Sequence, residues 1–74
     1  MNWFAIVTSG GNIGGAKVHR SLESAAQQIR WHQLRVAAGL EDSTPSAVRV
    51  VQCASRRQAY SASIADGLEV VLHA

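Results

Sequence analysis

Cysteine, proline and aromatic residues are scarce in this chain. Its 74 residues include one cysteine, Cys53, and one proline, and aromatic side chains account for 5%. A single cysteine excludes an internal disulfide and a cysteine-based zinc site, and it is consistent with a reducing cytosol. Because Cys53 lies within an apolar segment, we expect it to be a small buried hydrophobic residue rather than a nucleophile.

Long hydrophobic runs are also lacking. No stretch approaches the roughly 20 apolar residues that a membrane-spanning helix needs. The N-terminal segment has neither the basic residues nor the length of apolar run that a secretion signal requires. We therefore expect a cytoplasmic protein without a membrane partner.

Charge of either sign is sparse and spread along the chain. Seven lysine and arginine residues stand against five acidic residues, which gives a net charge of +2. A dedicated nucleic-acid-binding domain of this size usually has a denser basic face. The composition permits an acidic partner, and it leaves nucleic acid as a partner that is possible but not favoured.

Motifs for catalysis or for cofactor binding are not found. His19, His32 and His73 lack the spacing of metal ligands, and we expect them at the surface or at its rim. The glycine-rich segment 9–15, followed by Lys17, departs from both the dinucleotide-binding and the phosphate-binding loop patterns. A flexible connection between strands is therefore favoured over a ligand loop. We expect no enzyme activity, no metal and no cofactor.

The length predicts one small domain that spans residues 1–74. A chain of this size buries only about 60–65% of its unfolded surface. Much of the apolar content is alanine, so the core is expected to be thin. A thin core makes a homodimer, or a tight complex with another protein, a reasonable working form.

The segment from Ser21 to Leu40 is the one long stretch with helical periodicity. At about 100° per residue its apolar side chains form one stripe, interrupted only by Gln33. The members of this stripe are Leu22, Ala25, Ala26, Ile29, Val36, Ala37 and Leu40. Ser21 is suited to cap the N-terminus, and Gly39 can adopt the left-handed conformation that closes a helix.

Trp31 is the residue of this helix whose position calls for a functional explanation. It points directly away from the apolar stripe, with Leu34 beside it. Either the sheet wraps around the helix and the indole is part of the core, or Trp31 anchors a protein interface. In the second case Arg30 and Arg35 would be hydrogen-bond donors at the rim. Trp3 is a second candidate for such an anchor.

Three segments have the composition of strands. Residues 2–8 are apolar on both alternating faces, which is typical of a strand inside a sheet that is covered on both sides. Residues 16–20 can form a short second strand, with Val18 inward and His19 outward. Residues 47–54 form a third strand, and the segment 41–46 before it is the clearest loop of the chain.

The segment 55–65 admits two interpretations. Ser55 can cap a short helix that ends near Gly67, or a turn can lead into a strand over residues 59–65. A hairpin loop at 65–67 would place apolar residues opposite apolar residues at three successive positions. This matching favours the hairpin.

Together these elements predict an α+β fold. The expected order is β-β-α-β-β-β, with one helix packed on a small, mainly antiparallel sheet in two layers.

The segments 2–8, 21–29 and 60–72 resemble, in their general plan, small phage-encoded anti-CRISPR proteins that act on type I systems. The shared plan is a short chain with an N-terminal strand, a glycine turn, the helix SLESAAQQI and closing strands. The resemblance implies a non-enzymatic inhibitor in the host cytosol that binds a type I CRISPR surveillance complex or one of its Cas subunits. Many such inhibitors are acidic mimics of DNA, whereas this chain is basic. Steric blocking or docking on an acidic protein surface is therefore favoured.

The expected function is inhibition through protein–protein contact. The residues expected to bind the partner are Trp31, Arg30, Arg35, Arg56 and Arg57. Arg56 and Arg57 lie at a solvated turn if the hairpin forms, or else they act as two cationic prongs for carboxylates or phosphates. A small nucleic-acid-binding domain is the alternative, and a homodimer that pairs through the back of the helix is a further one.

Overall fold

The computed structural model describes residues 2–10, 13–41, 45 and 47–74 of the chain. Its elements, in chain order, are β1 (Trp3–Thr8), β2 (Val18–His19), α1 (Leu22–Ala37), β3 (Val48–Cys53), α2 (Arg56–Ser61), the 3₁₀ turn η1 (Ile64–Asp66) and β4 (Val70–His73). Most of the loop predicted over residues 41–46 lies outside the described residues. No helix in the described ranges is both long enough and apolar enough to cross a membrane.

The four strands form one antiparallel sheet in the order β2-β1-β3-β4. β1 and β3 pair over their full lengths at the centre of this sheet. A register shift between Val50 and Val51 gives β4 an extra residue, Val71, so that Val71 and Leu72 both face α1.

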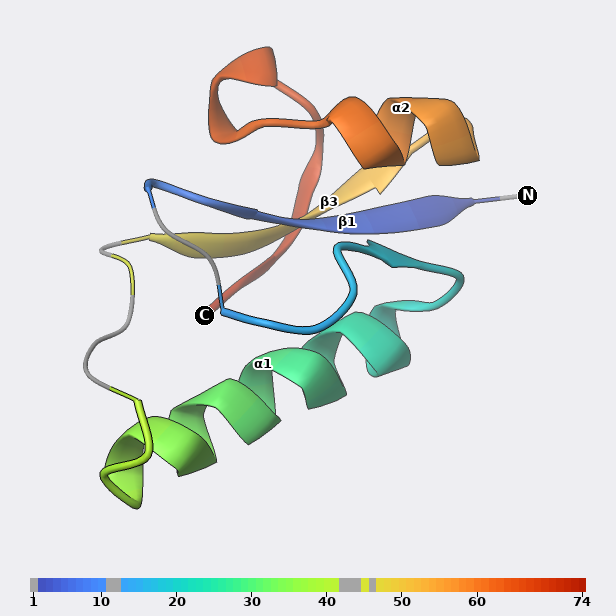
Figure 1. Cartoon of the computed structure of the whole chain (residues 1–74). Helices are drawn as coiled ribbons and strands as arrows, with labels where there is room; N and C mark the ends of the chain where they lie inside the picture. The colour runs from blue at the N-terminus through green and yellow to red at the C-terminus, as the bar shows by residue number, and fades with distance from the viewer. Residues whose placement is uncertain (1, 11–12, 42–44, 46) are drawn as a thin grey trace.

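Apolar side chains cover both faces of the sheet, as the two-sided pattern of residues 2–8 predicts. The cluster toward α1 consists of Ile6, Ile13, Ala25, Ile29, Val48 and Val50. The cluster on the opposite face consists of Ala5, Val7, Val51, Cys53, Ala59 and Ala62. Figure 1 shows α1 on one side of the sheet and α2 on the other. β1 is therefore an interior strand that is covered from both sides.

The predicted helix and both of its ends are confirmed. The Ser21 hydroxyl accepts a hydrogen bond from the backbone N–H of Ser24 at 3.1 Å. At the other end Gly39 has a φ of +76°. The N–H groups of Gly39 and Leu40 return to carbonyls of the last turn, which is the Schellman arrangement.

The strand predicted over residues 59–65 is wrong, because Arg56–Ser61 form the short helix α2. Ser55 caps α2 by accepting from the N–H of Gln58 at 3.1 Å. Ala59 is buried against the sheet on the face opposite α1. β4 pairs with β3 rather than with this segment, so the helix beginning after Ser55 is the interpretation that holds.

The α+β fold class is confirmed, since one main helix packs on a four-stranded antiparallel sheet. α1 and the sheet are the two predicted layers. α2 and η1 add cover on the other face of the sheet, and α2 stands in the chain where a strand was expected.

Candidate protein-binding surface

The outward face of α1 carries an open hollow of about 510 Å³. Its lining residues, which define the Trp31 surface, are Glu23, Ala26, Gln27, Arg30, Trp31 and Leu34. Trp31 is 50% exposed and Leu34 is 59% exposed. The structure thus places the Trp31 indole at the surface of the chain and not in its core.

Helix geometry explains this orientation. The buried residues of α1 are Ala25, Ile29 and His32. Trp31 follows Ile29 by two residues, a rotation of about 200° around the helix, so its side chain projects away from the sheet. The predicted stripe does not hold at its C-terminal end, where Leu40 follows the end of α1 and is exposed.

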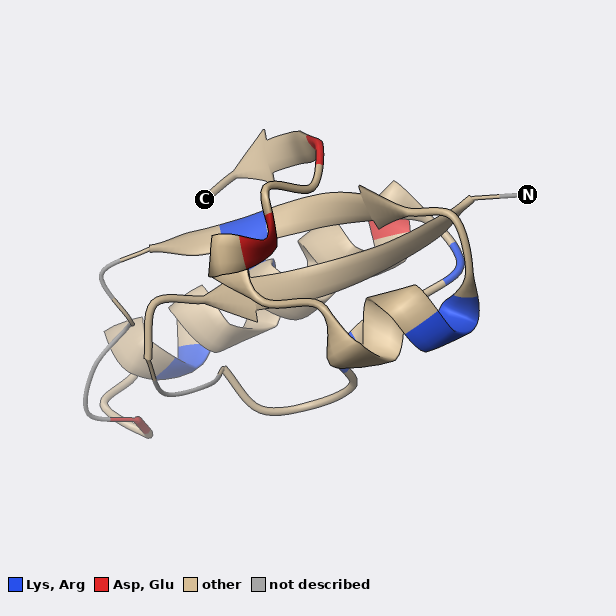
Figure 2. Cartoon of the chain, turned by 90° about the horizontal axis from the view of Figure 1, so that it is seen from above, with Lys and Arg blue, Asp and Glu red and all other residues tan. Residues whose placement is uncertain are grey.

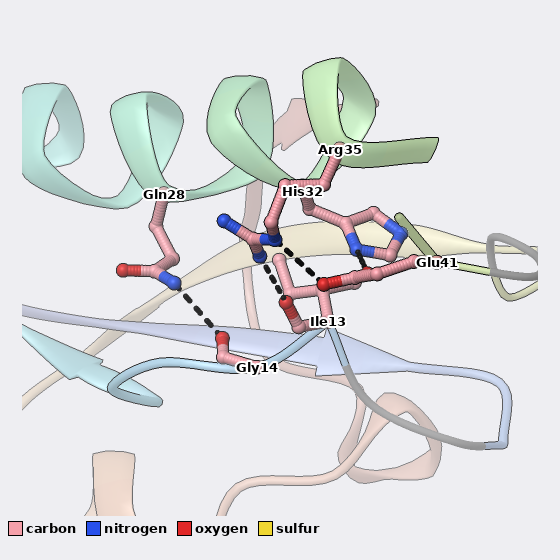
Figure 3. A network of polar contacts seen from close by, with 6 residues as sticks. All are labelled: Ile13, Gly14, Gln28, His32, Arg35 and Glu41. Atoms are coloured by element: carbon pink, nitrogen blue, oxygen red, sulfur yellow. Dashed lines mark hydrogen bonds and ion pairs between the residues drawn. The ribbon is translucent and has the colours of Figure 1, made fainter. Parts of the chain in front are cut away.

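The inward face of α1 is more polar than the sequence predicts. Gln28 Nε2 donates to the carbonyl oxygen of Gly14 at 2.9 Å, and Arg35 Nη2 donates to that of Ile13 at 3.0 Å. Figure 3 shows these side chains reaching from α1 to the chain segment below it. The two hydrogen bonds fasten part of the glycine-rich segment to the helix.

Arg35 is separate from the Trp31 surface. Its Nε donates to Glu41 Oε1 at 2.6 Å, on the inward side of α1. This hydrogen bond is the main reason that the pKa of Glu41 lies below its ordinary value, and the nearby charge of Arg35 acts in the same direction. The guanidinium of Arg35 is therefore engaged within the molecule, and the prediction that it contributes to the same surface as Trp31 finds no support in its position.

His19 and His32 are buried, so the expectation that they lie at the surface is wrong. His32 is 1% exposed, and its Nδ1 lies 2.6 Å from Glu41 Oε2 without the alignment of a hydrogen bond. The His19 ring lies between the Ser24 hydroxyl, 2.8 Å from Nδ1, and the Ala16 carbonyl, 2.7 Å from Nε2. A carbonyl can only accept, so Nε2 of His19 carries a proton.

Arg56 and Arg57 lie on the other side of the sheet from the Trp31 surface, at the start of α2. Figure 2 shows Lys and Arg positions in blue at the end of the molecule where the N-terminus lies, and Figure 1 shows the start of α2 at this same end. The five predicted residues therefore fall into three places. Arg30 and Trp31 share one hollow, Arg35 is directed inward, and Arg56 and Arg57 form a separate pair.

Trp3 also belongs to the α2 side of the sheet. Its side chain packs against the apolar cluster beneath α2, and the guanidinium of Arg20 lies 4.4 Å from the centre of its ring. Such a cation–π contact stabilises a partly exposed aromatic ring. Trp3 and Trp31 are therefore not parts of one surface.

The lysine after the glycine-rich segment contacts protein carbonyls. Lys17 Nζ donates to the carbonyl oxygens of Tyr60, at 3.2 Å, and Ala62. Because both carbonyls lie at the C-terminal end of α2, the ammonium also meets the negative end of that helix. Lys17 thus connects the β2 side of the sheet to α2.

Cys53 is buried, as predicted, and burial raises the pKa of its thiol. Within the described part of the chain, no three His, Cys, Asp or Glu side chains are grouped so that they could hold a metal ion. The large apolar side chains exposed on the described part of the chain are Trp31, Leu34, Leu40 and Tyr60. Comparison with known proteins finds no family model, no curated protein and no solved structure that matches this chain.

Proposed function

We propose that this chain is a non-enzymatic protein that binds another protein through the Trp31 surface. The observation that carries the proposal is the pair of large apolar side chains, Trp31 and Leu34, exposed side by side on the outward face of α1. Tryptophan and arginine are enriched among residues that dominate binding energy, and Arg30 lies in the same hollow. Burial of this hollow by a partner would remove the exposed apolar area from water.

The resemblance to small anti-CRISPR proteins supplies the partner class. The proposed partner is a type I CRISPR surveillance complex or one of its Cas subunits, and the proposed effect is inhibition by steric blocking. A net charge of +2 and the guanidinium of Arg30 favour an acidic area on that partner. Arg35 is left out of the proposed contact because its guanidinium is already engaged.

Fluorine NMR on protein labelled with 5-fluorotryptophan tests this proposal. The chain has two tryptophans, so two resonances are expected, and a Trp3→Phe variant assigns them. Addition of an unlabelled, purified type I complex should change the chemical shift of Trp31 far more than that of Trp3. Trp31→Ala should weaken binding by about 2 kcal/mol or more, roughly thirtyfold in Kd, as expected for an interface anchor.

Other results would point elsewhere. A Trp31 shift that changes with protein concentration, before any partner is added, would show self-association through this surface. If neither resonance moves with complexes of several type I subtypes, the proposed partner class is wrong. If Trp3 moves and Trp31 does not, the partner binds the α2 side of the sheet.

A further inference from the structure

The exposed face of α2 forms a second surface, on the side of the sheet opposite α1. Arg56 and Tyr60 are four residues apart on this helix, as are Arg57 and Ser61, so each pair is adjacent on the helix surface. They line an open hollow of about 650 Å³. Tyr60 is 74% exposed, which leaves its ring free to meet a ligand.

Arg56 and Arg57 have no acidic partner among the residues that the structure describes. In the part of the chain that the structure describes, neither guanidinium forms an ion pair or a side-chain hydrogen bond. The first turn of α2 contains no acidic residue. Asp66, the next acidic residue along the chain, accepts from the Ser63 N–H at 2.8 Å and from the Ser63 hydroxyl at 3.0 Å. The positive charge of Arg56 and Arg57 is therefore directed to solvent.

We infer that the α2 face binds single-stranded nucleic acid. Arg56 and Arg57 would contact phosphates of the backbone, since a guanidinium matches phosphate oxygens in geometry and charge. Tyr60 would stack on one base, and an aromatic ring can do so only when the base is unpaired. The Ser61 hydroxyl, at the margin of the same hollow, is a further hydrogen-bonding group.

The combination of two arginines with one exposed aromatic ring favours single-stranded nucleic acid over an acidic peptide as the ligand of this surface. A peptide anchor needs an apolar pocket, whereas the residue of α2 that is buried, Ala59, faces the sheet and not the hollow. A base needs only the flat face of one ring, with charge beside it for the phosphates. This surface lies across the sheet from Trp31, so the two can be occupied independently.

Fluorescence anisotropy of a labelled oligothymidylate of about 15 nucleotides tests the inference. Two phosphate contacts predict that log K falls against log salt with a slope near −1.4, because each contact in a single strand contributes about 0.7. Between about 50 and about 200 mM salt this slope corresponds to roughly a sevenfold loss of affinity. Arg56→Gln with Arg57→Gln should abolish most of the slope, and Tyr60→Ala should weaken binding about tenfold with the slope unchanged.

Arg30→Gln is the matched control for Arg57→Gln, because it removes the same charge from the opposite side of the sheet. It should leave the affinity for the oligonucleotide unchanged, and far-UV circular dichroism should show that every variant is folded. The inference is overturned if wild type does not bind at about 50 mM salt, or if Arg57→Gln and Arg30→Gln behave alike. Equal binding of a duplex, or equal competition by polyglutamate, would also overturn it, since neither offers an unpaired base.

Discussion

Among the described glycines, Gly15 is the one whose added Cβ would meet α1 most closely. Its φ is +75°, and a Cβ at this position would lie 1.7 Å from Gln28 Nε2. A non-glycine residue pays about 1–2 kcal/mol for the left-handed conformation. Gln28 would also have to move, with loss of its hydrogen bond to Gly14, which contributes about 1 kcal/mol.

Gly15→Ala is therefore expected to lower the free energy of unfolding by about 2–3 kcal/mol, measured by denaturant titration. Gly67→Ala is the matched control, because Gly67 has a φ of +71° but no atom within 4 Å of an added Cβ. The control should lose only the free energy that the left-handed backbone conformation costs. Equal losses in the two variants would mean that the contact with Gln28 does not contribute.

Glu41 makes the stability of the chain depend on acid pH. Its pKa in the folded state is lowered from the ordinary value of 4.5, first by the hydrogen bond from Arg35. A carboxylate with a lowered folded-state pKa stabilises the fold above its unfolded pKa, and this contribution is lost as the pH falls through the folded value. We expect thermal stability to decline between about pH 5 and pH 3.

Glu41→Gln should be less stable than wild type at neutral pH and should lose less stability over the same acid range. Asp66, whose pKa is lowered mainly by the hydrogen bond from the Ser63 N–H, contributes a separate part of the decline. Melting temperatures measured from pH 7 to about pH 3 check this prediction. An identical pH profile for wild type and Glu41→Gln would contradict the role given to the Arg35–Glu41 pair.

At the scale of whole elements, the local signals identified β1, α1 and β3 but not α2. Ser21 and Gly39 mark the ends of α1 within the helix sequence itself, and the structure uses both. For α2 the deciding contacts join distant parts of the chain, because β4 pairs with β3 and Ala59 packs on the face of the sheet opposite α1. Ser55 followed three residues later by Gln58 was the available signal, because this spacing is that of a capping box.

The candidate surface was predictable only in part. The outward position of Trp31 depends only on its rotation around one helix, so periodicity was sufficient. The position of Arg35 depends on Ile13 and Glu41, which the fold brings to the inner side of the helix. Periodicity alone carries no information about such partners, whereas the burial of His32, seven residues after Ala25 and three after Ile29, agrees with the helical spacing of the buried residues.

α2 is a short helix that depends on contacts outside itself. Lys17→Met keeps the length of the side chain but removes the hydrogen bonds to Tyr60 and Ala62. We expect this loss to cost about 1 kcal/mol, with roughly fivefold faster hydrogen exchange at the amide of Ala59. The amide of Ile29 in α1 serves as the internal control. Equal acceleration at both amides would show global destabilisation instead of local loosening of α2.

At the scale of the whole molecule, the sheet separates two exposed surfaces of different chemistry. The Trp31 surface on α1 combines the large apolar side chains of Trp31 and Leu34 with three polar residues, whereas the α2 surface has two arginines and one tyrosine. Both are presented by helices whose other sides cover the core, so substitutions at their exposed residues should leave the fold intact. This separation allows each surface to be tested without disturbing the other.

We propose that the Trp31 surface inhibits a type I CRISPR system by binding it. The most direct test is phage plaquing on a host with an active type I system, with the protein expressed as wild type, as Trp31→Ala/Leu34→Ala or as Leu40→Ala. Leu40 is 73% exposed but lies outside the Trp31 surface, so it controls for removal of exposed apolar area. The account predicts that wild type and Leu40→Ala restore plaquing and that the double variant does not. Restoration by the double variant, or no restoration by wild type across several type I subtypes, would contradict it.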